Sequence, residues 1–109
     1  MKTETFAEKM GLTPLTGFGE NREVSNVYIG DLLSVVMGKC QEGSAWITVQ
    51  THPNILTVAD LNDAACIVIA GGTAVEQSLV DKAGEVGVCV LTSDKDAYEL
   101  AWRMHEVLK

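Results

Sequence analysis

Hydrophobic residues along the chain gather in short runs, and each run is followed by a segment in which they recur every three or four positions. Nearly continuous apolar runs rich in Val and Ile are typical of parallel strands covered on both faces. Three segments have this character, residues 45–50, 65–70 and 88–91, and residues 23–29 are predicted as a fourth strand for their Val, Ile and Tyr content. The helical spacing predicts four helices between and after them: residues 31–39, 54–61, 74–85 and 96–108.

The alternation of strand and helix predicts a parallel sheet built from βαβ units. We expect a single α/β domain over residues 1–109, with a mostly parallel sheet of four to five strands and helices on both faces. Residues 1–22 are expected to add a helix over 3–10 and an edge strand over 12–16, because Pro14 cannot occupy a central strand. Residues 23–109 then form the main α/β unit.

Polar residues and glycines mark the expected helix ends. Asp31 begins the helix over 31–39, and Ser93 or Asp94 precedes the last helix, so these side chains can accept hydrogen bonds from free amides. Gly11 and Gly87 follow two other helices and predict left-handed C-caps.

The charge of the chain excludes several classes of partner. Its 109 residues are 47% hydrophobic, enough for one core, and carry a formal net charge of −7. Phosphate backbones are bound by clustered cations, and the chain has no stripe of Lys or Arg, so we expect no nucleic-acid partner. No apolar run approaches about 18 residues, and the first residues lack an apolar leader, so we expect neither a membrane span nor export. The expected location is the cytoplasm.

Three cysteines support the same location, because an odd number without an export signal is typical of reduced thiols. Cys66 and Cys89 lie in apolar strand runs and are expected in the core. Cys40 lies in a polar loop and is expected to be more exposed. No Cys or His pair has metal-ligand spacing, so no metal site is predicted.

Small polar residues follow each predicted strand, and the carboxyl ends of parallel strands share one edge of a sheet. Their amides and hydroxyls are candidates for binding an anion such as a phosphate. The candidate residues at this edge are Gly30, Asp31, Thr51, His52, Asn54, Gly71, Gly72, Thr92 and Ser93. Helix caps and turns use the same residue types, so a purely structural role is the alternative.

His52 is the candidate with the most chemistry, because a neutral imidazole can accept a proton or hydrogen-bond a phosphate. The alternative is a loop histidine that caps backbone groups. His105 is expected to be exposed near the end of the last helix. No phosphate-loop, GxSxG or HExxH motif is present, so no catalytic residue is assigned.

Several stretches resemble the signature region of the DRTGG domain family. Residues 22–38 contain REV, VYIGDLLS and VMG in order, and residues 45–50 (AWITVQ) are followed by His52, Asn54 and the strand over 65–69. The order and spacing hold to about Leu108, so the resemblance covers nearly the whole chain. The name-giving motif departs from the family, because residues 21–26 read NREVSN where a stretch like Asp-Arg-Thr-Gly-Gly is expected. Asn26, which ends this segment, joins the candidate ligand contacts.

The resemblance implies an α/β regulatory module. DRTGG domains accompany nucleotide-binding CBS domains in certain inorganic pyrophosphatases, occur in certain phosphotransacetylases, and are similar to the N-terminal domain of HPr kinase/phosphorylase. Stand-alone copies are often labelled serine kinases by that similarity, and the missing phosphate loop argues against this activity here. We therefore expect a non-catalytic, ligand-sensing homodimer that binds an adenine nucleotide or another phosphate-like anion, with no other cofactor.

Two further functions stay open. The chain can be an accessory subunit that docks on a metabolic or redox enzyme, for example a hydrogenase, since short relatives are associated with iron-only hydrogenase genes. Tyr98 and Trp102 of the last helix are candidate anchors for such a contact, with core packing as the alternative. A small enzyme that uses His52 as acid or base is the third possibility.

Overall fold

Strands and helices alternate along the computed structural model, which describes residues 1–109. The ten elements are α1 (Thr3–Met10), β1 (Thr13–Pro14), β2 (Asn26–Ile29), α2 (Leu33–Lys39), β3 (Ser44–Thr48), α3 (Asn54–Leu61), β4 (Cys66–Ile69), α4 (Gln77–Val86), β5 (Val90–Thr92) and α5 (Ala97–Leu108). No helix combines the length and the apolar character needed to cross a bilayer.

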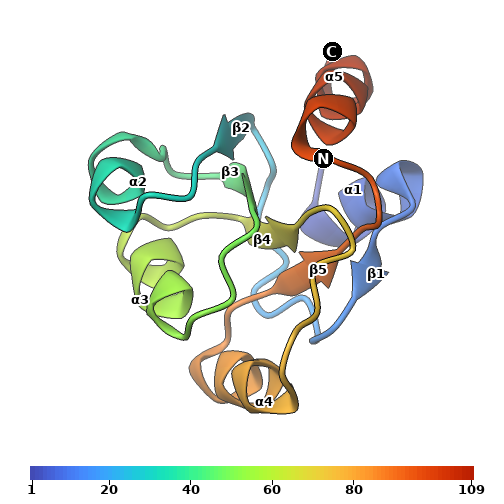
Figure 1. Ribbon diagram of the computed structural model, residues 1–109. Helices are drawn as coiled ribbons and strands as arrows, with labels where there is room; N and C mark the ends of the chain where they lie inside the picture. Colours follow the sequence, from blue (N-terminus) through green and yellow to red (C-terminus); the bar gives the residue numbers. More distant parts are fainter.

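The five strands form one sheet in the order β1-β5-β4-β3-β2. The four strands from β2 to β5 are parallel neighbours in chain order, and β1 pairs with β5 in the antiparallel sense. Figure 1 shows β2 at one edge of the sheet and β1 at the other. The prediction of a single α/β domain with a mostly parallel sheet is confirmed, and Pro14 lies in an edge strand as expected.

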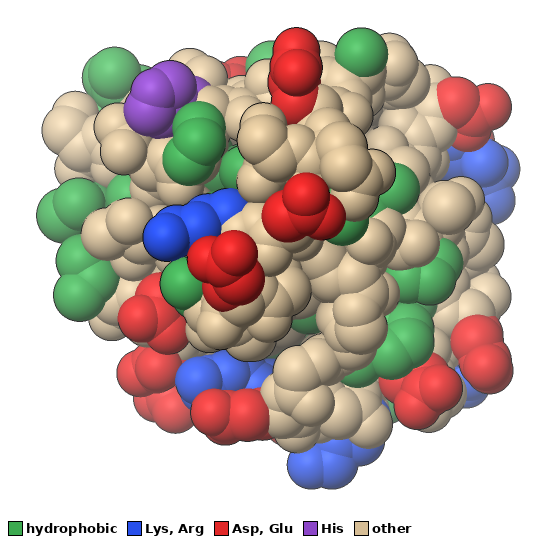
Figure 2. All heavy atoms as spheres, turned by 90° about the horizontal axis from the view of Figure 1, so that it is seen from below, with side chains coloured by type: hydrophobic (Ala, Val, Ile, Leu, Met, Phe, Trp, Pro, Cys, Tyr) green, Lys and Arg blue, Asp and Glu red, His purple; other side chains and the backbone are tan.

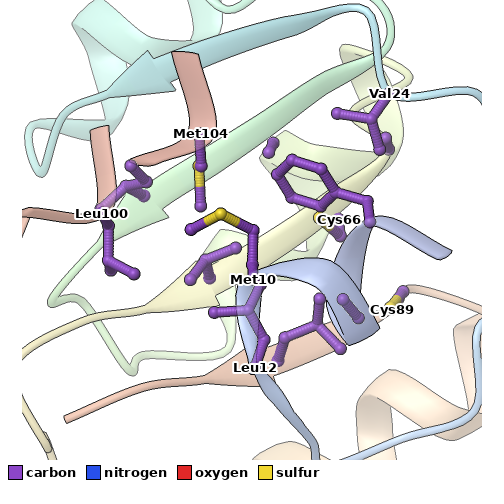
Figure 3. Close-up of a cluster of buried hydrophobic side chains, with 14 of the residues drawn as sticks. Met10, Leu12, Val24, Cys66, Cys89, Leu100 and Met104 are labelled. Atoms are coloured by element: carbon purple, nitrogen blue, oxygen red, sulfur yellow. The ribbon is translucent and has the colours of Figure 1, made fainter. Parts of the chain in front are cut away.

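Helices cover both faces of the sheet, and a separate hydrophobic core lies under each layer. Helices α1 and α5 pack over one face, where Phe6, Met10, Leu100 and Met104 are buried against the strands. Figure 3 shows Met10 and Met104 pointing toward one another above the sheet. Helices α2, α3 and α4 pack over the other face, where the core centres on the fully buried Trp46. Strand residues alternate between the two cores, which explains their continuous apolar runs.

Several predicted strand boundaries are wrong by a few residues, and hydrogen bonds explain the differences. Strand β2 begins at Asn26 rather than Glu23, because residues 23–25 run beside the amino terminus: Val24 donates to the Met1 carbonyl, and Glu23 bridges to Lys2. Strand β3 ends at Thr48 because the Val49 amide leaves the ladder and donates to the Asp31 carboxylate.

Two of the predicted capping roles are also wrong. Asp31 does not cap α2, because its carboxylate bonds to Thr48 and Val49, and Leu32 occupies the N-cap. Asp96, rather than Ser93 or Asp94, caps α5 by accepting a hydrogen bond from the Glu99 amide at 2.9 Å. The C-caps Gly11 and Gly87 are confirmed, and both have the expected left-handed backbone.

Helix α4 begins at Gln77 rather than Ala74, because Glu76 still has an extended backbone and the Thr73 hydroxyl closes a turn onto Ala70. Cys40 is buried rather than exposed. The Asn62 amide reaches from the end of α3 to the Cys40 carbonyl, which draws this part of the loop against the core.

Candidate functional site

The carboxyl ends of β2, β3, β4 and β5 lie on one edge of the sheet, because all four strands are parallel and in close register. We call this the carboxyl edge. Nine of the ten predicted ligand residues follow these strand ends and lie there, as the sequence suggests. Asn26 does not, because it begins β2, and it pairs with Ser44 at the opposite, amino edge of the sheet.

Asp31 is a structural part of the carboxyl edge. Its Oδ1 accepts hydrogen bonds from the Thr48 hydroxyl at 2.7 Å and from the Val49 amide at 2.9 Å. The Gln50 side-chain amide donates a hydrogen bond of 3.0 Å to the Asp31 carbonyl, so the junctions after β2 and β3 are joined. This carboxylate therefore stabilises the end of the sheet, as the structural alternative predicts for it. Gly30 is used similarly, since its amide donates to Ile47 and its carbonyl accepts from the Trp46 indole.

The junctions after β4 and β5 are joined by their backbones. Gly71 donates to the Lys95 carbonyl at 2.8 Å, and Gly72 donates to the Ser93 carbonyl at 2.9 Å. Both glycines have positive φ angles, a backbone conformation that glycine adopts without strain, and in it their amides bond to the loop after β5. The Ser93 hydroxyl accepts from Lys95, and the Thr92 hydroxyl donates to Ile69. These four predicted ligand residues therefore spend most of their hydrogen-bonding groups on the fold.

The junction after β3 keeps more free donors than the others, and Thr51 and His52 carry them. Neither their amides nor the Thr51 hydroxyl makes a hydrogen bond within the chain. The His52 Nδ1 accepts from the Asn54 amide at 3.1 Å, so in the neutral ring Nε2 carries the proton and is a second side-chain donor. His52 is exposed, and the turn leads directly into the positive end of α3.

The charges of the carboxyl edge oppose an anion at long range. Exposed carboxylates of Asp31, Asp94 and Asp96 stand at the strand ends, with Lys95 as the nearby cation. The whole chain adds a net charge of −7. An anion at Thr51 and His52 must therefore gain from direct hydrogen bonds more than it loses in an acidic field.

The segment that replaces the family motif lies at the amino edge and holds α1 in place. Thr3 donates through its amide and its hydroxyl to the Arg22 carbonyl, and Asn21 accepts from the Glu4 amide at 2.9 Å. The terminal ammonium of Met1 bonds to Glu23 and lowers the pKa of that carboxyl. These contacts satisfy amides in the first turn of α1.

A hollow of about 470 Å³ flanks this segment at the amino edge, and none of its lining residues is hydrophobic. Four carboxylates and two cations line it: Glu20, Glu23, Glu42, Asp63, Lys2 and Arg22. Arg22 lies 3.5 Å from Asp63 and 3.6 Å from Glu20, so the one guanidinium is shared. This hollow is too acidic to suit a phosphate.

The three thiols are inert parts of the core. Cys40, Cys66 and Cys89 are all buried and unpaired, so the predicted core positions of Cys66 and Cys89 are confirmed. Burial raises the pKa of all three thiols, that of Cys89 to about 11. No group of three or more His, Cys, Asp or Glu side chains is arranged to hold a metal ion.

Sequence reasoning missed the residues that hold the carboxyl edge together. Thr48 and Gln50 lie within or beside a strand pattern, and their one local bond, from the Gln50 amide to the Thr48 hydroxyl, gives no sign of the contact with Asp31. Asn62 is a second case, because its amide donates to the carbonyls of Val36, Met37 and Cys40 at the end of α2. Polar residues just beyond a helix end were the available signal.

Comparison with known proteins adds a family and a fold. A family model described as the DRTGG domain matches residues 7–107. Among solved structures, the CBS and DRTGG domains of the regulatory region of Clostridium perfringens pyrophosphatase, complexed with the activator diadenosine tetraphosphate, are similar with a TM-score of 0.72 at 11% identity. The alignment covers 94% of this chain and 45% of that chain, so this chain spans less than half of that region. No curated protein matches the chain.

Proposed function

The chain belongs to the DRTGG domain family, and from this premise we propose that it is a non-catalytic regulatory module that senses a small anion at its carboxyl edge. The expected ligand is an adenine nucleotide or another phosphate-like metabolite. The expected location is the cytoplasm, where three unpaired thiols stay reduced.

The observation that carries this proposal is the free set of donors on Thr51 and His52. Two consecutive amides, one hydroxyl and the Nε2–H group offer hydrogen bonds to phosphate oxygens. At the other strand ends, the amides of Gly30, Gly71 and Gly72 are bonded within the fold. The side chains of Asp31, Thr92 and Ser93 are bonded there too, so these residues form a rigid support around this turn. The pyrophosphatase region of similar fold was crystallised with an adenine dinucleotide, which makes this ligand class the first to test.

The surroundings of His52 favour binding over catalysis. A histidine that acts as general base needs a group to orient its ring and a nucleophile or substrate proton within reach. The one hydrogen bond that His52 makes within the chain is with the Asn54 backbone amide. None of the ion pairs of the chain involves His52. The ring is therefore placed as a hydrogen-bond donor.

Isothermal titration calorimetry with ATP, AMP and inorganic phosphate tests the proposal. The wild-type chain should bind at least one of them with a dissociation constant below about 1 mM, which corresponds to about −4 kcal/mol. His52→Ala should weaken binding at least 5-fold, and His105→Ala, on the exposed face of α5, should leave it unchanged. No binding at millimolar ligand, or equal effects of the two variants, would overturn the proposal.

A docking function as an accessory subunit is the second candidate, and the exposed aromatic pair on α5 favours it. Tyr98 is 78% exposed and Trp102 is 46% exposed, so core packing does not explain either residue. The guanidinium of Arg103 stacks on the Trp102 ring at 4.9 Å. Exposed Trp, Tyr and Arg side chains are the usual anchors of protein interfaces.

A photo-crosslinking amino acid at position 98, compared with one at position 61, tests this second candidate in the native host. Leu61 is similarly exposed but lies on α3. An enzyme subunit crosslinked from position 98 and not from 61 would support docking through α5. Crosslinking to no protein at position 98, or equally at both, would contradict it.

A further inference from the structure

Strand β2 leaves one side of the sheet open. Its hydrogen bonds go to β3 alone, and the strand order ends there. Because the Gly30 amide points to β3, the alternation of the ladder turns the N–H and C=O groups of Val27 and Ile29 outward. Residues 26–29 (NVYI) contain no Pro, Lys or other charge, the devices by which edge strands avoid pairing.

Hydrophobic side chains surround this open strand. Ile29 is 48% exposed, and on the α2 side of the strand Leu32 is 66% and Val35 is 42% exposed. Val49, 49% exposed, lies next to Asp31, which its amide contacts. We call Ile29, Leu32, Val35 and Val49 the β2 patch. In Figure 2 several hydrophobic side chains lie at the left, on the flank where Figure 1 places α2 and α3, and others lie at the top and right of this view.

Helix α2 is short, and most of its residues are exposed. It has seven residues, contains Gly38, and buries only Val36 completely. A helix this short is marginal without tertiary contacts. The structure therefore presents an apolar helix face beside an unpaired strand, and both gain from being covered.

The charge distribution decides which partner fits. Two copies of a chain with a net charge of −7 repel each other unless their contact avoids the charged surface. Residues 26–37 carry a single charged side chain, Asp31, although 21% of the chain is charged. That carboxylate is turned toward Thr48 and Val49. Over residues 26–37, two copies can therefore meet with Asp31 as the one charged side chain of each, and Lys109 and His105 line a hollow beside the start of β2.

We propose that a second copy of the chain docks on the β2 patch, with the two β2 strands antiparallel about a two-fold axis. This pairing would join the two five-stranded sheets edge to edge and place α2 beside its counterpart on the same face. Four half-exposed side chains supply roughly 350 Å² of apolar surface per copy, which is within the size of the often functional largest patch of a typical monomer. The two patches together supply roughly 700 Å², so the paired strands and α2 must bury the rest of the roughly 1,200 Å² at which specific dimers begin. The inference is independent of the ligand proposed for Thr51 and His52.

Sedimentation equilibrium on the full chain, from 1 to 200 μM, tests this inference with a matched pair of variants. Leu32→Glu places two carboxylates near the two-fold axis, whereas Leu61→Glu changes a leucine of equal exposure, 65%, outside the β2 patch. The wild type and Leu61→Glu should be dimers with similar dissociation constants, and Leu32→Glu should dissociate at least 100-fold more readily. Ile29→Lys, which puts a cation on the edge strand, should do the same. Circular dichroism should show equal folding of all four.

Three results would overturn the proposal. A wild-type monomer at 200 μM would mean that the β2 patch has a different occupant or none. Wild-type affinity in both Leu32→Glu and Ile29→Lys would place the dimer contact elsewhere. An equal loss in Leu61→Glu would show that added charge, and not the patch, is what separates the copies.

Discussion

Removal of the Asp31 carboxylate should destabilise the chain in the absence of any ligand. In Asp31→Ala, the Thr48 hydroxyl and the Val49 amide lose their acceptor, and the junctions after β2 and β3 are no longer joined by a side chain. Thr48 is 2% exposed, so water cannot easily replace the lost partner. The Val49 amide is exposed to water, which replaces part of its bond.

These exposures set the expected magnitude. A hydrogen bond to an ionised group contributes about 1.5 to 3 kcal/mol, and we take the low end for Thr48 because Asp31 itself is exposed. The solvent-accessible Val49 bond adds about 0.5 kcal/mol. Asp31→Ala should therefore lower the free energy of unfolding by about 2 kcal/mol, and the thermal midpoint of a domain of this size by about 8 °C. Asp31→Asn keeps an acceptor oxygen without the charge and should lose about half as much.

Urea unfolding followed by circular dichroism measures this loss, with Asp94→Ala as the control. Asp94 is also an exposed carboxylate at the carboxyl edge, but its side chain makes no hydrogen bond, so its removal should change stability by less than about 0.5 kcal/mol. The slope with urea should be the same in all variants. Equal stability of Asp31→Ala and wild type would refute the structural role of Asp31, as would an equal loss in Asp94→Ala.

Three further predictions concern the framework of the fold. Gly84→Ala, in the interior of α4 with open space around the new methyl, should raise the free energy of unfolding in urea by about 0.5 to 1 kcal/mol. Gly19→Ala should lower it by more than about 2 kcal/mol, because φ is +57° and the methyl would lie 2.7 Å from a backbone oxygen. The opposite order of stability would contradict the backbone geometry. The buried thiols should resist Ellman's reagent at pH 8 until the chain is unfolded, and fast labelling of the native protein would disprove their burial. The free energy of unfolding should be unaffected below about pH 9 and fall as the pH rises toward about 11, because the unfolded chain releases the Cys89 proton before the folded chain does. Asn62→Ala should lower the free energy of unfolding by about 1 to 2 kcal/mol and speed amide hydrogen exchange in the last turn of α2, whose carbonyls lose their side-chain donor. Unchanged exchange in that turn would show that this cap is dispensable.

The fold could be predicted from the sequence because the apolar residues of each strand and helix follow the spacing typical of that element. The apolar runs around Trp46 and Ile67 are strands buried on both faces, and these strands pair in parallel, as such runs predict. The capping roles were harder to predict, since several polar residues stood near each helix start. Asp31 had its partners 17 and 18 positions away on β3, and no local pattern records such a contact.

The position of the candidate site at the carboxyl edge could be predicted from the sequence. The hydrogen bonds within that site could not. Parallel strands must bring their carboxyl ends together, so nine of the ten residues were placed correctly from chain order alone. Which of them keep free donors depends on loop-to-loop bonds, such as those from Gly71 to Lys95 and from Gly72 to Ser93. Likewise, the outward position of Tyr98 depends on how α5 is rotated over the sheet, which a pattern with apolar residues on several faces does not fix.

Two-dimensional ¹⁵N–¹H correlation spectra recorded during titration with ATP, AMP and inorganic phosphate test the central claim most directly. We expect progressive, saturable shifts of the Thr51 and His52 amides, because these groups would exchange water for phosphate oxygens. The Gly71 and Gly72 amides, already bonded within the chain, should shift less. Shifts centred on the amino edge around Arg22, or no shift at 5 mM of any of the three compounds, would contradict a sensor at the carboxyl edge.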